Sequence, residues 1–214
     1  NPDVSLSNAD AVSLTLSNVT LFAGVGGSLD AQGTLSDYSD DTVVNGTLGF
    51  GGAITGDLRV VAIKAGTASY LGLESDANVL SADLIGLGAL LEFHAYGGTL
   101  KLNKFGGTAT AKIDWTNLST TGLPLVSLAV SDALDLHVDG SVALNALSGT
   151  LVATGSFALD VGQVSGNDNA GPNPDVSLSN ADAVSLTLSN VTLFAGVGGS
   201  LDAQGTLSDY SDDT

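Results

Sequence analysis

Basic residues are scarce in this chain, and cysteine and methionine are absent: only five of the 214 residues are Lys or Arg. Without cysteine there is no disulfide framework and no thiolate metal site. Without a basic patch to neutralise phosphates, we expect no binding to nucleic acid or to an anionic membrane surface. No run approaches 18 consecutive apolar residues, so we expect no membrane insertion.

Long charged helix formers are also rare, because Glu occurs only as Glu74 and Glu92 and the remaining acidic charge is carried by Asp. The formal net charge is −18, while 43% of the residues are hydrophobic. That apolar content is enough for a core. The shortage of Glu and Lys disfavours exposed amphipathic helices and favours strands separated by tight turns. Self-repulsion at this net charge would keep a long polymer soluble.

Alternation of apolar and polar residues with a period of two is the prevailing pattern. It is clear in Val12-Ser13-Leu14-Thr15-Leu16 and returns along the whole chain. The pattern predicts an all-β fold, in which an antiparallel meander forms an elongated sandwich or an open barrel. A β-solenoid is the alternative. The predicted strands are 12–16, 19–21, 43–50, 58–65, 69–73, 90–96, 99–104, 108–115, 125–130, 134–138, 142–147 and 151–161.

Glycine-containing pairs separate these strands and predict tight turns, because such pairs supply the positive φ that short hairpins need. The Leu-rich segment 78–90 has two glycines and lacks Glu and Lys, so we interpret it as strand and turn rather than helix. The predicted turn pairs are Gly51-Gly52, Gly97-Gly98, Gly106-Gly107, Asp139-Gly140 and Ser148-Gly149.

A long internal repeat organises the chain. Residues 1–42 recur letter for letter as residues 173–214, at an offset of 172. A repeat of this length is too long for one coil of a solenoid and is typical of a domain. We therefore interpret residues 1–172 as one complete tandem module and residues 173–214 as the first quarter of the next, identical module. We expect the parent protein to be a longer array of such modules.

The boundary between the two modules is predicted at residues 166–175, which contain two glycines, two prolines and five Asx residues. A quarter of a module needs a partner to be ordered. We therefore expect residues 173–214 to pair through their backbone with the preceding module or with another chain. This predicts a sheet that continues from repeat to repeat, with neighbouring modules as the principal partners and lateral self-association into filaments as a further one.

Two clusters of oxygen-bearing side chains are candidates for a Ca²⁺ site, because hard cations take six to eight oxygen ligands. The first is Asp37, Asp40 and Asp41; the second is Asn167, Asp168 and Asn169 together with Asp3 or Asp175. Neither cluster matches an EF-hand loop. The alternative is an Asp-rich solvated turn, and no other cofactor is expected.

The five basic residues all fall between positions 59 and 112, whereas residues 1–42 contain six Asp and no positive charge. This asymmetry suggests contacts between acidic and basic surfaces of successive modules, which salt would weaken. The alternative is a charge distribution without a role. The basic residues are Arg59, Lys64, Lys101, Lys104 and Lys112.

No catalytic motif is present. The two histidines, His94 and His137, lie within predicted strands, and we interpret them as polar positions on solvent-facing sides. There is no G-x-S-x-G elbow, and the glycines at 24–27 lack the spacing and the Lys-Ser/Thr of a phosphate loop. The sequence therefore predicts a protein that is not an enzyme.

The long unmutated repeat and the Asp-rich, Cys-free composition carry a resemblance, together with the segments Gly140-Ser141-Val142-Ala143-Leu144 and Thr154-Gly155-Ser156-Phe157-Ala158-Leu159. The chain resembles the repeat regions of giant bacterial surface proteins, including large RTX-type adhesins. The resemblance implies an all-β extender at the bacterial cell surface that holds a terminal binding domain away from the cell. The Ca²⁺-binding G-G-x-G-x-D nonapeptide of that family is absent here, so calcium dependence does not carry over.

We expect a non-catalytic structural repeat of a long extracellular bacterial fibre or adhesin. The alternative is a module whose surface binds glycans or a partner protein. Such a surface would use some of the few aromatic residues, which are chiefly Tyr70, Phe93, Tyr96, Phe105 and Trp115.

Overall fold

The computed structural model describes residues 4–169 and 176–202, and nearly all regular structure in these ranges is β-strand. The exceptions are two single turns of 3₁₀ helix. The strands are β1 (Asp10–Val25), β2 (Ser28–Asp30), β3 (Thr42–Val44), β4 (Leu48–Ala65), β5 (Ala68–Ser75), β6 (Leu80–Ile85), β7 (Leu91–Gly106), β8 (Leu134–Ala146), β9 (Leu151–Asn167) and β10 (Ser177–Ala195); the 3₁₀ turns are η1 (Gly88–Leu90) and η2 (Trp115–Asn117).

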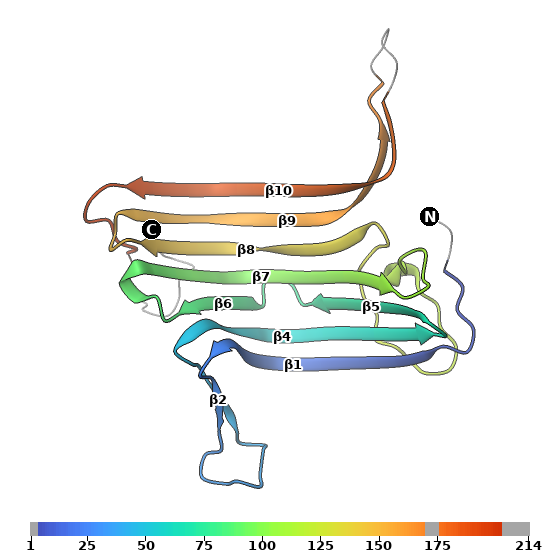
Figure 1. Ribbon diagram of the computed structural model, residues 1–214, viewed down its shortest axis with the longest axis horizontal. Helices are drawn as coiled ribbons and strands as arrows, with labels where there is room; N and C mark the ends of the chain where they lie inside the picture. Colours follow the sequence, from blue (N-terminus) through green and yellow to red (C-terminus); the bar gives the residue numbers. More distant parts are fainter. Residues whose placement is uncertain (1–3, 170–175, 203–214) are drawn as a thin grey trace.

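Eight of the strands form one antiparallel sheet in the order β1-β4-β5-β7-β8-β9-β10, with β6 also paired to β4 and β7 (Figure 1). β5 and β6 run in the same direction and share the place between β4 and β7, so they are two halves of one interrupted strand. The predicted antiparallel meander is therefore confirmed. In 78–90, the predicted strand and turn are present as β6 and the bend after it, whereas residues 88–90 form the 3₁₀ turn η1, which was not predicted. The alternative of a β-solenoid is not supported, because solenoid coils stack their strands in parallel.

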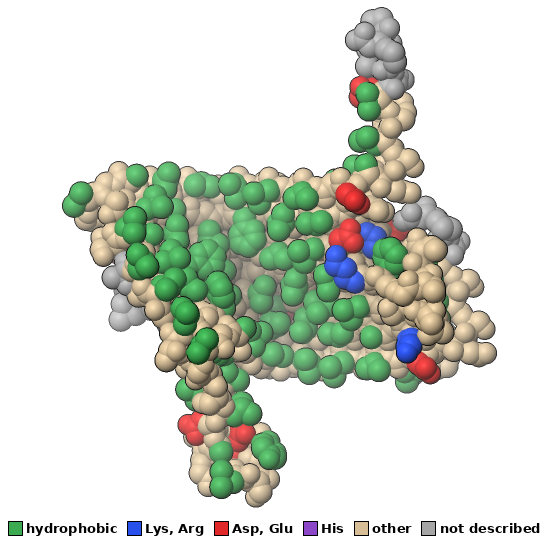
Figure 2. Space-filling model, in the orientation of Figure 1, with side chains coloured by type: hydrophobic (Ala, Val, Ile, Leu, Met, Phe, Trp, Pro, Cys, Tyr) green, Lys and Arg blue, Asp and Glu red, His purple; other side chains and the backbone are tan. Residues whose placement is uncertain are grey.

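One face of the sheet is apolar along all its strands, and the other is polar except where the segment 107–133 covers it, as period-two alternation requires. Figure 2 shows the apolar face, on which hydrophobic side chains cover most of the sheet. The register lines these side chains up in rows that cross every strand. One such row consists of Leu14, Val60, Leu73, Leu102, Leu136, Val161 and Val184.

The core lies on the other face, under the irregular segment 107–133. Ile113, Trp115, Leu128 and Val130 of this segment are buried against Val61, Ile63 and Tyr70 of β4 and β5. The predicted strands 108–115 and 125–130 are wrong, because neither stretch forms a backbone ladder with the sheet, and the segment instead packs its side chains down onto the sheet. The alternation that predicted them reflects one-sided burial of an irregular chain.

Three of the predicted turns are also wrong. Gly51-Gly52, Gly97-Gly98 and Asp139-Gly140 lie inside β4, β7 and β8. Where β7 pairs with β8, glycine is needed because the two backbones approach closely. A Cβ on Gly98 would lie 2.8 Å from the carbonyl oxygen of Asp139, and Gly140 has a φ of 149°. The pairs Gly106-Gly107 and Ser148-Gly149 do lie at strand ends, as predicted.

The same sequence has two environments at the start of each copy. In the first copy, Val4, Leu6 and Ala9 pack against the core cluster. In the second, the equivalent Val176 and Leu178 are 58% and 48% exposed, and they lie in an arm that β9 and β10 extend away from the sheet (Figure 1). Gly166 and Asn167 of the predicted boundary belong to the end of β9, whereas residues 170–175 lie outside the described ranges.

Candidate functional site at the two sheet edges

The two copies of the repeated sequence lie at opposite edges of the main sheet (Figure 1). Within the described ranges, β1 from the first copy pairs in this sheet only with β4, and β10 from the second copy pairs only with β9. Each strand has alternating apolar and polar residues, so each can be part of a sheet with one apolar face. The same sequence therefore forms both edge strands. At one edge it pairs with β4, near the start of the module, and at the other it pairs with β9, at the end of the module.

The direction of the two strands is the same. β10 lies six strand positions away from β1 in a sheet whose neighbours are all antiparallel, and an even number of reversals restores the original direction. Placing a second copy of the sheet so that its β1 coincides with β10 therefore needs no reversal of the chain.

The two strands also present the same face. The row that begins at Leu14 ends at Val184, which is the equivalent of Val12. The register therefore moves by two residues across one module. A shift by an odd number would turn every apolar side chain to the other face, whereas an even shift keeps the apolar face continuous.

The edges of the repeated strand use different backbone groups. Directly after β10, the N–H of Gly196 donates to the carbonyl of Thr150 beside β9, at 2.9 Å. In β1, the carbonyl of Val25 accepts from the N–H of Thr47 beside β4, at 2.9 Å. Gly196 is the equivalent of Gly24, the neighbour of Val25, and consecutive residues of a strand direct their backbone groups to opposite edges. One strand of this sequence can therefore form both ladders at once.

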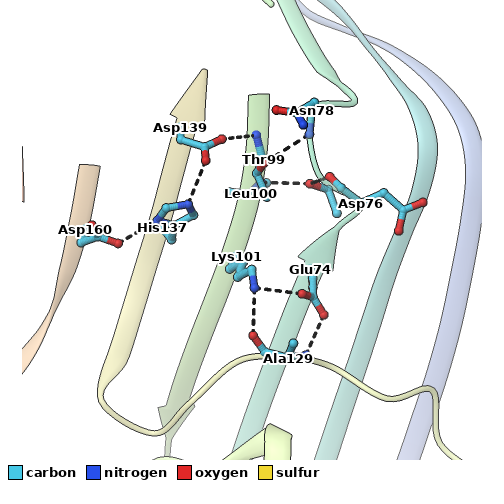
Figure 3. A network of polar contacts seen from close by, with 11 residues as sticks. Glu74, Asp76, Asn78, Thr99, Leu100, Lys101, Ala129, His137, Asp139 and Asp160 are labelled. Atoms are coloured by element: carbon cyan, nitrogen blue, oxygen red, sulfur yellow. Dashed lines mark hydrogen bonds and ion pairs between the residues drawn. The ribbon is translucent and has the colours of Figure 1, made fainter. Parts of the chain in front are cut away.

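A charged row crosses the polar face and joins the segment 107–133 to the sheet (Figure 3). Lys101 Nζ lies 3.1 Å from Glu74 Oε1 and donates to the Ala129 carbonyl at 3.0 Å. The Ala129 N–H donates to Glu74 Oε2 at 2.7 Å. Glu74 is a buried residue, and its partners satisfy both carboxylate oxygens, as a buried charge requires.

His137 lies further along the same row, between two carboxylates (Figure 3). Its Nδ1 is 2.7 Å from Asp160 Oδ1 and its Nε2 is 3.3 Å from Asp139 Oδ2. Asp139 also accepts the N–H of Thr99 through its other oxygen, at 2.7 Å. Both ring nitrogens therefore have hydrogen-bond partners: His137 joins β8 to β9 directly, and its partner Asp139, also on β8, contacts Thr99 of β7.

The first predicted cation cluster lies in the loop between β2 and β3, residues 31–41. The hydroxyl and the N–H of Ser39 bind the Asp37 carboxylate and hold its pKa below the ordinary value. Both oxygens of Asp40 accept from the Thr34 hydroxyl, and one oxygen of Asp41 is buried without a hydrogen bond. The carboxylates of Asp37 and Asp40 thus have partners within the loop.

The second predicted cluster lies in the arm, at the opposite end of the molecule from the first (Figure 1). Asn167 Oδ1 accepts the N–H of Asn169, and Asp168 Oδ1 accepts the N–H of Val176. Asp3 and Asp175 lie outside the described residues. Within residues 4–169 and 176–202, no three acidic or imidazole side chains gather as a metal site would require. Calcium at either cluster stays a prediction.

The basic residues mostly form ion pairs inside the module. Arg59 lies 2.8 Å from Asp76, and Lys101 lies beside Glu74. Lys104 and Lys112 share Asp135, at 3.7 and 3.2 Å. Four of the five cations thus have acidic partners within the same module, which weakens the hypothesis that they contact the acidic residues of another module.

Two of the aromatic candidates for a binding surface are unavailable, because Tyr70 and Trp115 are buried in the core. The Trp115 Nε1–H donates to Asn103 Oδ1 at 2.9 Å, and the Asn103 amide donates to the carbonyls of Ile113 and Ser131. Sequence reasoning missed Asn103, since nothing in its sequence surroundings distinguishes it from a solvated Asn. Phe105 is 44% exposed and lines an open hollow of about 490 Å³ on the sheet.

Among the described residues, no helical segment has the length and apolar character needed to span a membrane. Comparisons with known proteins found no match: no family model fits the chain, and no curated protein or solved structure is significantly similar to it.

Proposed function

We propose that this chain is a non-catalytic structural repeat of a long extracellular bacterial fibre or adhesin, in which successive modules share one continuous antiparallel sheet. The observation that carries the proposal is the placement of identical strands at the two edges. β1 and β10 agree in direction and in face, and they use complementary backbone groups. In the proposed array, β10 of one module is β1 of the next.

The dimensions of such a fibre follow from the strand order. Six strand positions separate β1 from β10, and at about 4.8 Å per position they give a repeat of about 29 Å along the fibre. The strands run across the fibre, and the 16 residues of β1 correspond to a width of about 54 Å. The proposed fibre is therefore a ribbon whose stiffness comes from unbroken backbone ladders.

The placement at the cell surface depends on the resemblance to adhesin repeats. The proposed partners are the neighbouring modules of the same chain and, through the apolar face, a second ribbon. The apolar face supports lateral association, because contiguous exposed apolar patches of this kind mark interaction surfaces. Two such faces in contact would form the sandwich that the alternation pattern predicts.

The test is electron microscopy of proteins that contain one, two or three further complete 172-residue units. We expect particles of constant width whose length grows by about 29 Å per added unit. Separate globular modules of this size would add about 40 Å each, with variable angles between them. A chain of separate globules would overturn the proposal.

A further inference from the structure

We propose that the β9 edge is a binding site for a second copy of this chain, which docks residues 10–25 in the place that β10 occupies. The result is a head-to-tail oligomer formed by strand exchange. This inference concerns contacts between separate chains, whereas the proposed fibre concerns successive modules within one chain.

The binding argument follows from sequence identity. β10 forms an extended ladder with β9, from the pair Ser177–Asn167 to the pair Ala195–Leu151. Residues 10–25 have the same sequence as residues 182–197. Any backbone or side-chain contact that β9 makes with residues 182–195 is therefore equally available from β1 of another chain.

The donor chain does not have to give up its own ladder. β1 is held by β4 from Asp10–Lys64 to Val25–Leu48, through backbone groups that alternate with those that β10 offers to β9. A donor β1 can therefore stay paired with β4 while its free edge pairs with the β9 of an acceptor. The donor's own β9 edge can in turn accept β1 of a third chain in place of its β10, so the contact is heterologous and does not close.

For exchange to occur, the β10 of the acceptor chain must leave the β9 edge. The incoming β1 therefore competes with β10, and this competition sets the chain concentration at which exchange occurs. β10 is tethered to β9 by a short connection, which gives it an effective concentration in the millimolar range. Exchange should therefore be a minor equilibrium at micromolar chain concentrations. A covalent trap can accumulate the exchanged state.

The experiment uses full-length chains, into which cysteines can be introduced without interference because none is native. Leu159 of β9 pairs with Leu186 of β10, whose equivalent in β1 is Leu14. The variant Leu14→Cys/Leu159→Cys cannot close a disulfide within one chain: β1 and β9 are five strand positions apart, about 24 Å, and a disulfide joins Cα atoms within about 7 Å. Under mild oxidation we expect covalent dimers and longer ladders that contain a peptide linking positions 14 and 159.

Two matched variants make the result decisive. Leu159→Cys/Leu186→Cys should form a disulfide within the chain, which shows that the second copy occupies the β9 edge in solution. Ser13→Cys/Leu159→Cys should give at least about tenfold fewer cross-links, because position 13 faces the other side of the sheet. The single variants Leu14→Cys and Leu159→Cys report any symmetric contact through the apolar face.

The outcomes separate the two proposals. If the 159–186 disulfide forms while 14–159 links do not exceed those of the Ser13→Cys control, strand exchange is overturned and the continuous-sheet proposal is not. If the 159–186 disulfide also fails to form, the edge placement of β10 is wrong and both proposals fall. Links at 14–159 that increase with chain concentration support exchange.

Discussion

At the scale of single residues, Asn103 is the side chain that fastens the segment 107–133 to the sheet. It is fully buried, and its amide makes three hydrogen bonds, to the Ile113 carbonyl, the Ser131 carbonyl and the Trp115 ring. Asn103→Ala would leave the buried Ile113 carbonyl and Trp115 Nε1–H without these bonds, whereas the Ser131 carbonyl would keep the N–H of Leu134 as a donor at 3.4 Å. We expect the free energy of unfolding to fall by about 3 kcal/mol or more.

Urea denaturation is the measurement for Asn103→Ala, with Asn117→Ala as the matched control. Asn117 is exposed and bonds only to the neighbouring Asp114, so its loss should change the free energy of unfolding by about 0.5 kcal/mol or less. Equal effects of the two substitutions would show that the segment is not held by the Asn103 bonds.

Asp76 gives a prediction about pH. The N–H of Asp57 and, to a smaller degree, the Arg59 guanidinium lower the pKa of Asp76. A lowered folded-state pKa means that its stabilisation is present above the unfolded-state value, near pH 4, and is lost as the pH falls through the folded-state value. Thermal melting between pH 6 and pH 2 should therefore show a flatter acid limb for Asp76→Asn. Arg59→Gln should flatten the acid limb only in part, because the N–H of Asp57 is the larger cause of the lowered pKa. If Arg59→Gln flattened the acid limb as much as Asp76→Asn does, Arg59 and not the N–H of Asp57 would be the main cause.

At the scale of elements, the arm and the first residues of the chain show one sequence in two environments. Leu6 packs against the core, whereas its equivalent Leu178 is 48% exposed. We expect Leu6→Ala to lower the free energy of unfolding by about 1–2 kcal/mol and Leu178→Ala by about 0.5 kcal/mol or less. Chemical denaturation of both variants checks this, and similar losses would show that the two copies share one environment.

The strands themselves could largely be predicted, because period-two alternation in β1, β4, β8 and β9 is a local property of the sequence. The segment 107–133 could not, since one-sided burial gives the same alternation whether or not the backbone pairs. The glycines of β7 and β8 were wrongly predicted as turns for a related reason. A glycine that permits two strands to approach closely can have the same neighbours in the sequence as a glycine in a turn.

The functional site was predictable only in part. The identity of residues 1–42 and 173–214 predicts backbone pairing between modules, but it does not give the edge to which each copy pairs. That depends on the register of six successive strand pairs, which arises from long-range contacts. The partners of Glu74 and Asn103 depend in the same way on contacts across tens of residues.

At the scale of the whole molecule, charge and apolar surface oppose each other. The net charge of −18 makes chains repel one another at low salt. The apolar face, with Val12, Leu14 and Leu186 exposed, favours contact between two sheets and is not weakened by salt. Because four of the five basic residues have partners within the module, few cations remain to attract a second chain. Screening should therefore remove more repulsion than attraction.

We accordingly expect self-association to increase when NaCl is raised from about 0.05 to 0.5 M, over which the Debye length falls from more than 10 Å to below 8 Å. Sedimentation velocity measures it directly. Leu73→Glu places a charge in the middle of the apolar row and should abolish the increase, because an unpaired charge is costly to bury between two sheets. Thr15→Glu adds the same charge to the opposite face and should preserve it. Association that weakens with salt would instead mean that acidic and basic surfaces of different chains meet, and the apolar face would then not be the lateral contact.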